Sequence, residues 1–162
     1  MRFVYGKQEM RSLSRSQESC FLLTNGLGGY ASLTAAYSAN RCDQGVLIAA
    51  QKAPGERVTL VHRLRETLTV DGKPYWLSTQ QFADGTTPED GFRNLSFFAF
   101  ENIPHWRYHI GGVRVTRTMA MTYGQNTTAV IYKVENQSND ACSLTVDPFV
   151  KFGPKETAIK TA

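Results

Sequence analysis

Hydrophobic and polar positions alternate along this chain in short runs that turn residues separate. Residues 57–64 are a clear case, with Val58, Leu60 and Leu64 on one face of an extended segment. Such alternation is typical of a strand with one buried face. Further strands are expected at 66–70, 75–77, 92–100, 104–110, 113–122, 126–135 and 142–150. Because turns recur about every ten residues and no long amphipathic pattern interrupts them, the chain is predicted to be all-β, a sandwich or a barrel.

Glycine-containing pairs mark where these strands reverse. Asp71-Gly72 separates two β-rich runs, and Asp-Gly in that position is a strong hairpin signal. Gly111-Gly112 is expected to turn the strand 104–110 into the next one, whereas the polar residues 79–91 predict a long loop. Arg117 shares the otherwise apolar face of the strand 113–122, so it must lie at a sheet edge or be paired.

Size, charge and cysteine usage limit the class of protein. A chain of 162 residues is long enough for one domain, here expected at 1–150, with a polar tail or the start of a linker at 151–162. The net charge of +4 comes from scattered basic residues, so no nucleic-acid partner is expected. The start carries no secretory signal, and the longest strongly apolar run, Val46–Ala50, is too short for a membrane. Cys20, Cys42 and Cys142 are widely spaced, which predicts free thiols and a cytoplasmic protein.

Three glycines within four positions follow Asn25 and precede Tyr30, in the order Asn-Gly-Leu-Gly-Gly-Tyr. Glycine permits positive φ and leaves room for a close contact. The spacing loosely fits a dinucleotide-binding turn, which would need a helix directly after the glycines and repeated strand–helix–strand units. The weak periodicity of residues 30–40 and the absence of such units favour a tight turn between two strands.

The same stretch carries a family resemblance. Residues 21–32, then Asn40-Arg41 and the apolar run 45–50, are similar in order to the opening of the N-terminal domain of bacterial and archaeal glycogen debranching enzymes. The likeness extends over about residues 18 to 150, through Val70-Asp71-Gly72, Pro104-x-Trp106-x-Tyr108 and residues 124–128. The family usually has a second arginine and a Tyr-His pair where this chain has Cys42, Asp43 and Gln44.

The resemblance implies a large antiparallel β-sandwich of the supersandwich kind that precedes the helical barrel in glucoamylase-like enzymes. It implies a parent glycoside hydrolase, an amylo-α-1,6-glucosidase, that cleaves branches of an α-glucan such as glycogen. The partner would be a helical (α/α) toroid catalytic domain that is absent from this chain. The isolated chain is then expected to be non-catalytic and without a cofactor. The alternatives are a stand-alone α-glucan-binding module and a purely structural interaction domain.

The residues themselves offer no strong catalytic or metal site. Asp84, Glu89 and Asp90 lie in or beside the polar loop, where nothing favours protonation of one carboxyl over another, so no catalytic residue is assigned. His105 and His109 share a strand face at about 13 Å, which is too far to share a metal.

Sugar or domain contact is the remaining chemistry. Asn25 can cap the glycine turn or bind a hydroxyl, and Arg41 offers a fork of donors to hydroxyls or to a carboxylate. Tyr30 and Trp76 lie next to turns and are candidates for stacking, whereas Trp106 has apolar neighbours and is expected to be buried. The predicted contact residues are Asn25, Gly26, Gly28, Gly29, Tyr30, Arg41 and Trp76.

Overall fold

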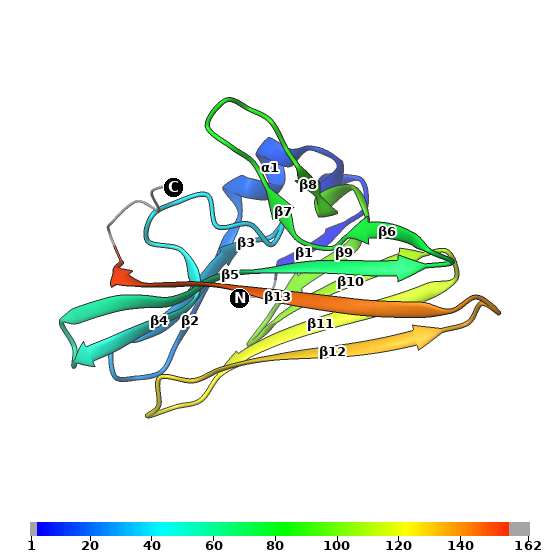
Figure 1. Ribbon diagram of the computed structural model, residues 1–162. Coiled ribbons are helices and arrows are strands. Elements are labelled where there is room, and N and C mark those ends of the chain that lie inside the picture. Colours follow the sequence, from blue (N-terminus) through cyan, green and yellow to red (C-terminus); the bar gives the residue numbers. More distant parts are fainter. Residues whose placement is uncertain (1–2, 156–162) are drawn as a thin grey trace.

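Two antiparallel β-sheets stack face to face in the computed structural model of this chain, which describes residues 3–155 (Figure 1). The helices are η1 (Glu9–Arg11), α1 (Leu13–Glu18) and η2 (Gly91–Arg93). The strands are β1 (Phe3–Gly6), β2 (Cys20–Thr24), β3 (Tyr30–Thr34), β4 (Gly45–Lys52), β5 (Glu56–Val70), β6 (Lys73–Trp76), β7 (Thr79–Gln80), β8 (Glu89–Asp90), β9 (Leu95–Phe100), β10 (Pro104–Ile110), β11 (Val113–Met121), β12 (Thr128–Asn136) and β13 (Cys142–Pro154).

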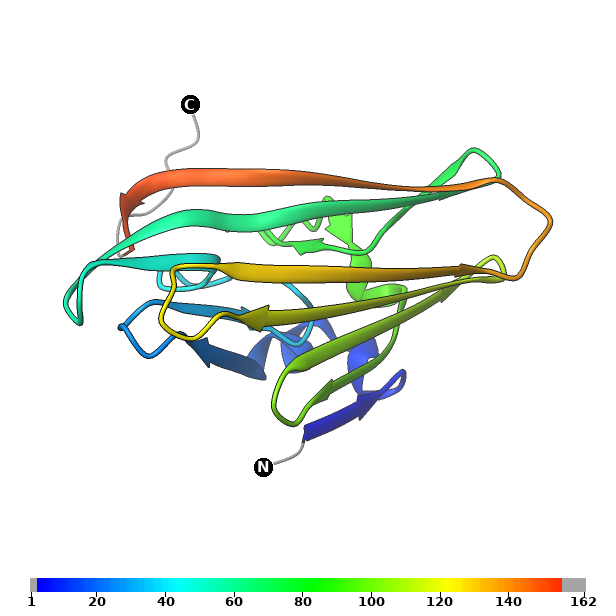
Figure 2. The ribbon, with the colours of Figure 1, turned by 90° about the horizontal axis from the view of Figure 1, so that it is seen from below.

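The strand order defines two main sheets. The first sheet runs β1-β9-β10-β11-β12, and the second runs β13-β5-β4-β3-β2, with β6 paired to the far end of β5. The short strands β7 and β8 form a separate pair. β12 and β13 are edge strands of the two sheets, and Figure 2 shows the loop that connects them at one end of the sandwich. The all-β, antiparallel sandwich predicted from the alternating pattern is therefore confirmed.

The core lies between the sheets and contains the inward half of each alternating strand. Trp106 on β10 is fully buried, as expected, and its indole nitrogen donates a hydrogen bond of 2.9 Å to the carbonyl of Ala35. Its ring contacts Phe21 from β2 edge-on at 5.4 Å between centroids, and Tyr37 at 5.2 Å. Because these rings come from both sheets, they fix how the two sheets lie on one another.

Arg117 is paired rather than placed at an edge. Its fully buried guanidinium donates to the carboxylate of Glu66 on the opposite sheet and, at 2.6 Å, to the hydroxyl of Tyr108. Tyr132 donates to the other carboxylate oxygen of Glu66. Burial raises the pKa of Glu66, while Arg117 and the hydrogen bond from Tyr132 oppose that shift. A buried charged pair thus connects the two sheets.

The element boundaries differ from the sequence pattern in a few places. The two segments predicted at 57–64 and 66–70 are one long strand, β5. The predicted loop 79–91 contains the short pair β7–β8, and β9 begins only at Leu95 because η2 precedes it. β1 and α1 were not predicted. β13 extends to Pro154, past the predicted end at residue 150. Residues 156–162 of the predicted tail lie outside the described residues, so the domain limit stays a prediction.

Candidate functional site

The three glycines form a tight turn between β2 and β3. The two strands pair antiparallel from Cys20 with Thr34 to Thr24 with Tyr30. The amide of Asn25 donates to the carbonyl of Gly29 across the turn at 3.1 Å. A strand, and not a helix, follows the glycines, so the turn lacks the helix N-terminus that a dinucleotide-binding loop needs. The interpretation as a turn between strands is confirmed.

Each glycine of the turn is required by a positive φ, by a close contact or by both. Gly26 and Gly28 have φ of +79° and +95°, which side chains rarely adopt. A Cβ on Gly28 would lie 2.7 Å from the carbonyl oxygen of Pro54, and one on Gly29 would lie 2.6 Å from the side-chain oxygen of Asn126. The inner side of the turn therefore packs on two other turns of the same chain.

Asn126 links these turns, which lie at the same end of the sandwich (Figure 2). Its Nδ2 donates to the carbonyl of Ala50 at 2.9 Å, and its Oδ1 accepts from the amide of Ala50 at 3.1 Å. The same oxygen accepts from Nδ2 of Asn25 at 3.0 Å, while the carbonyl of Asn25 accepts from the amide of Gly124 at 2.7 Å. Asn25 and Asn126 thus connect the β2–β3 turn to β4 and to the β11–β12 turn.

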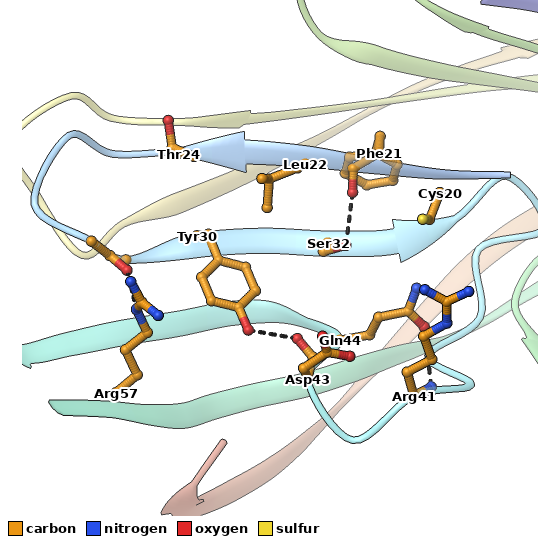
Figure 3. Close-up of a pocket in the computed structure, with 12 residues that line it drawn as sticks. Cys20, Phe21, Leu22, Thr24, Tyr30, Ser32, Arg41, Asp43, Gln44 and Arg57 are labelled. Atoms are coloured by element: carbon orange, nitrogen blue, oxygen red, sulfur yellow. Dashed lines mark hydrogen bonds between the residues drawn. The ribbon is translucent and has the colours of Figure 1, made fainter. Parts of the chain in front are cut away.

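A groove of about 510 Å³ lies beside the turn, on the outer face of β2 and β3 (Figure 3). Its walls come from β2, β3, the loop before β4 and the start of β5. The lining residues are Cys20, Phe21, Leu22, Thr24, Gly28, Gly29, Tyr30, Ser32, Arg41, Asp43, Gln44 and Arg57. The groove therefore combines an apolar stripe from β2 with two arginines and one carboxylate.

Tyr30 lies in the wall of this groove, where its hydroxyl and its ring each contact another part of the chain. Its hydroxyl donates to the carbonyl of Asp43 at 2.7 Å, a bond drawn in Figure 3. The Arg57 guanidinium lies 5.8 Å from the ring centroid, and its Nε donates to the carbonyl of Gly28 at 2.7 Å. Partial burial, with a smaller contribution from Asp43, raises the pKa of Tyr30. Tyr30 and Arg57 hold the turn, the loop and β5 together.

The loop before β4 carries the residues that depart from the family pattern. Gln44 is buried, and its Oε1 accepts from the amides of Asn40 at 2.9 Å and Arg41 at 3.2 Å. Arg41 itself is exposed and lines the groove. The buried Gln44 side chain therefore fixes the loop and places Arg41 at the groove.

The model of the glycogen debranching enzyme N-terminal domain matches residues 19–161, which is most of the chain and includes the whole groove. The chain belongs to this family. No curated protein and no solved structure matches it. The suspected resemblance is therefore confirmed at the level of the debranching-enzyme N-terminal domain.

Within this debranching-enzyme domain, the structure gathers most of the predicted contact residues but not all. Gly28, Gly29, Tyr30 and Arg41 line the groove, and the exposed Gly26 lies in the adjoining turn. Asn25 is fully buried with its amide bonded inside the protein, so its contribution to a contact is to brace the turn.

Trp76 lies elsewhere in the domain. It is partly buried and pairs with Thr67 on β5, about 33 Å along that strand from Arg57 at about 3.3 Å per residue. The structure therefore does not bring Trp76 to the groove. Arg57 and Gln44 at the groove were missed, and so was the structural role of Asn126, although Asn126 lies in one of the family-like motifs.

The candidate catalytic carboxylates have different surroundings. Glycoside hydrolysis generally needs two carboxyl groups, and Asp43 is the one carboxylate among the groove-lining residues. Glu89 is buried and engaged by Arg63 and Ser78, each at 2.7 Å. Hydrogen bonds from Thr86 lower the pKa of Asp84, which is the reverse of what a general acid requires.

No group of three or more potential metal ligands occurs within residues 3–155. In the same part of the chain, no helix is long and apolar enough to cross a membrane.

Proposed function

We propose that this chain is a non-catalytic domain that packs on a helical (α/α) toroid catalytic domain and helps shape the cleft for an α-glucan. The parent enzyme would hydrolyse α-1,6-glucosidic branches of a glucan such as glycogen. Membership of the debranching-enzyme N-terminal family over residues 19–161 is the observation that carries the proposal. The single carboxylate of the groove is in keeping with a supporting role.

The groove and the turn beside it are the surface proposed to meet the helical domain. Leu22 is 57 % exposed and Leu27 is 40 % exposed, although Phe21 and Leu23 of the same hairpin are buried in the core. Exposed apolar side chains rimmed by polar groups are characteristic of interaction surfaces. Arg41 and Asp43 at the rim can form charged hydrogen bonds with a partner surface.

Reconstitution from separate domains tests this surface. The chain alone is expected to release no glucose from limit dextrin, whereas mixing it with the separately produced helical domain should raise glucose release. Leu22→Asp should abolish that increase. Ile131→Asp is the matched control, because Ile131 is similarly exposed, at 60 %, on the outer face of a strand of the other sheet. Equal loss in both variants, or glucose release by the chain alone, would contradict the proposal.

A direct contact with glucan is the second candidate, and the half-exposed ring of Tyr30 in the groove favours it. Glucose offers apolar faces to aromatic rings, and Arg41 and Asp43 could bind its hydroxyls. Retardation of the chain in a native gel that contains glycogen, weakened by Tyr30→Ala, would support this function. Unchanged mobility at high glycogen would exclude direct glucan binding but would not affect the proposed packing on the helical domain.

A further inference from the structure

A second polar surface lies on the outer face of the first sheet, away from the groove. Strand register places six residues in two rows. Arg107 on β10 pairs with Thr116 on β11, which pairs with Lys133 on β12. The next row is His109, Arg114 and Glu135 on the same three strands. We call these six residues the basic array.

Their side chains share one face because strand residues two apart point the same way. Neighbouring strands are about 4.8 Å apart and residues two apart about 7 Å, so the array fits within roughly 10 Å by 7 Å. The intervening residues on β10 and β11, such as Tyr108 and Val115, point into the core. The array therefore faces solvent, and with Ser96 it lines a hollow of about 630 Å³.

The array carries more positive than negative charge. Glu135 is its one carboxylate and is shared by Lys133 at 2.9 Å and Arg114 at 3.9 Å. The hydrogen bond from Lys133, and then the charges of Lys133, Arg114 and Arg107, lower the pKa of Glu135. Three permanent cations and one carboxylate leave two positive charges in excess.

Arg107 is the cation without a carboxylate. No ion pair joins it to an acidic side chain among residues 3–155, and its guanidinium instead lies 5.1 Å from the ring centroid of Phe97. The hydroxyl of Thr116 lies in the row between Arg107 and Lys133, so an anion held between these two cations would also meet a hydroxyl donor.

We propose that the basic array binds a phosphate group as its dianion, either as orthophosphate or as a phosphate monoester on a sugar. The two excess positive charges match a dianion. An arginine fork and a lysine on opposite sides of a hydroxyl provide donors to several oxygens of one tetrahedral group. The compact shape of the array suits one such group better than an extended acidic peptide, which would need cations in a line.

NMR titration of the purified chain tests the site at constant ionic strength. Orthophosphate and glucose 6-phosphate are the probes, and chloride and glucose are the references. Saturable shifts are expected at amides of residues 107–116 and 133–135 with one or both phosphate probes. Arg107→Gln and Lys133→Gln should each weaken binding by about tenfold or more, because each removes a charge-assisted hydrogen bond. Lys73→Gln, an exposed change on the second sheet, should leave the titration unchanged.

The two probes separate the sources of the phosphate. Equal affinities would indicate that the phosphate alone is recognised, and tighter binding of glucose 6-phosphate would indicate a monoester whose sugar also contributes. Shifts that do not saturate, shifts that chloride reproduces, or an Arg107→Gln chain that titrates like the unaltered one would overturn the proposal. Tighter binding of a poly-glutamate peptide than of either phosphate would also overturn it.

Discussion

Replacing Gly28 by alanine tests whether the glycine turn is held by its contact with Pro54. Gly28 has φ of +95°, and its added Cβ would lie 2.7 Å from a backbone oxygen that cannot rotate away. Gly85 provides the matched control. It also has a positive φ, of +87°, but a Cβ there would meet nothing within 4 Å. The two substitutions thus share the backbone strain and differ in the contact.

The expected effects follow from these two contributions. Alanine at a positive φ costs about 1–2 kcal/mol, and the reduced freedom of the unfolded chain returns about 0.4–1 kcal/mol. Gly85→Ala should therefore lower the free energy of unfolding by about 0–1.5 kcal/mol. Gly28→Ala should lose about 1–3 kcal/mol more, the usual cost of overpacking. With a urea m-value of about 2 kcal/mol per M, the midpoints of the two variants should differ by about 0.5–1.5 M.

Urea unfolding followed by tryptophan fluorescence measures this difference, because Trp106 is buried in the core. The m-values of both variants must equal that of the unaltered chain, so that midpoints report stability alone. If Gly28→Ala and Gly85→Ala have the same urea midpoint, the turn can shift away from Pro54 to accommodate the added methyl group. The account of the turn as a fixed element would then be refuted.

Three more predictions concern polar side chains: the exposed Asn126, the buried Glu66 and the half-buried His62. Asn126→Ala should destabilise the chain by about 2–4 kcal/mol in urea unfolding, because it leaves the amide and carbonyl of Ala50 without their partners; a loss below about 0.5 kcal/mol would show that water replaces them. Glu66→Ala should lower the free energy of unfolding by about 3–5 kcal/mol, because it leaves Arg117 buried without its counter-charge. The double change Glu66→Leu with Arg117→Met removes both charges and should recover most of that loss. A double variant as unstable as Glu66→Ala would contradict this account. Burial and neighbouring positive charges lower the pKa of His62, so the unfolded chain takes up this proton at a higher pH than the folded chain. Stability should therefore fall as pH drops below about 6.5. Between about pH 7.5 and 5.5, the urea midpoint of His62→Gln should fall less than that of the unaltered chain. An equal fall in both would mean that other groups cause the pH dependence.

The sandwich could be predicted from the sequence because central strands such as β10 and β11 bury one face and leave the other outside the core. The alternation at residues 104–122 predicted that Trp106 is buried and that Arg117 lies at a sheet edge or is paired. The pattern could not name Glu66 as that partner, since it lies on a strand of the other sheet. Short elements such as α1 were missed because six residues contain too few periods to show a pattern.

The groove was only partly predictable for a similar reason. The glycines predicted a close contact, but the contacting groups are Pro54 and Asn126. These two residues belong to turns that are distant in the sequence and meet the glycine turn only in the folded sandwich. Trp76 looked equivalent to Tyr30 because both lie next to turns. The long strand β5 separates them, and the sequence pattern had divided that strand into two.

The inner contacts of the glycine turn affect how well its outer surface can bind a partner. Pro54, Asn126 and the carbonyl–amide bond to Gly124 fix the backbone from within, while Leu27 at the tip is 40 % exposed. A loop ordered in advance loses little conformational freedom when a partner binds, so more of the contact energy remains as affinity. The glycines therefore act through rigidity: they let the backbone approach its own neighbours so closely that the turn presents a fixed outer surface. On this reasoning, a change that loosens the inner contacts, such as Gly28→Ala, should also weaken the proposed docking of the helical domain, although the added methyl group would point at Pro54 of the same chain.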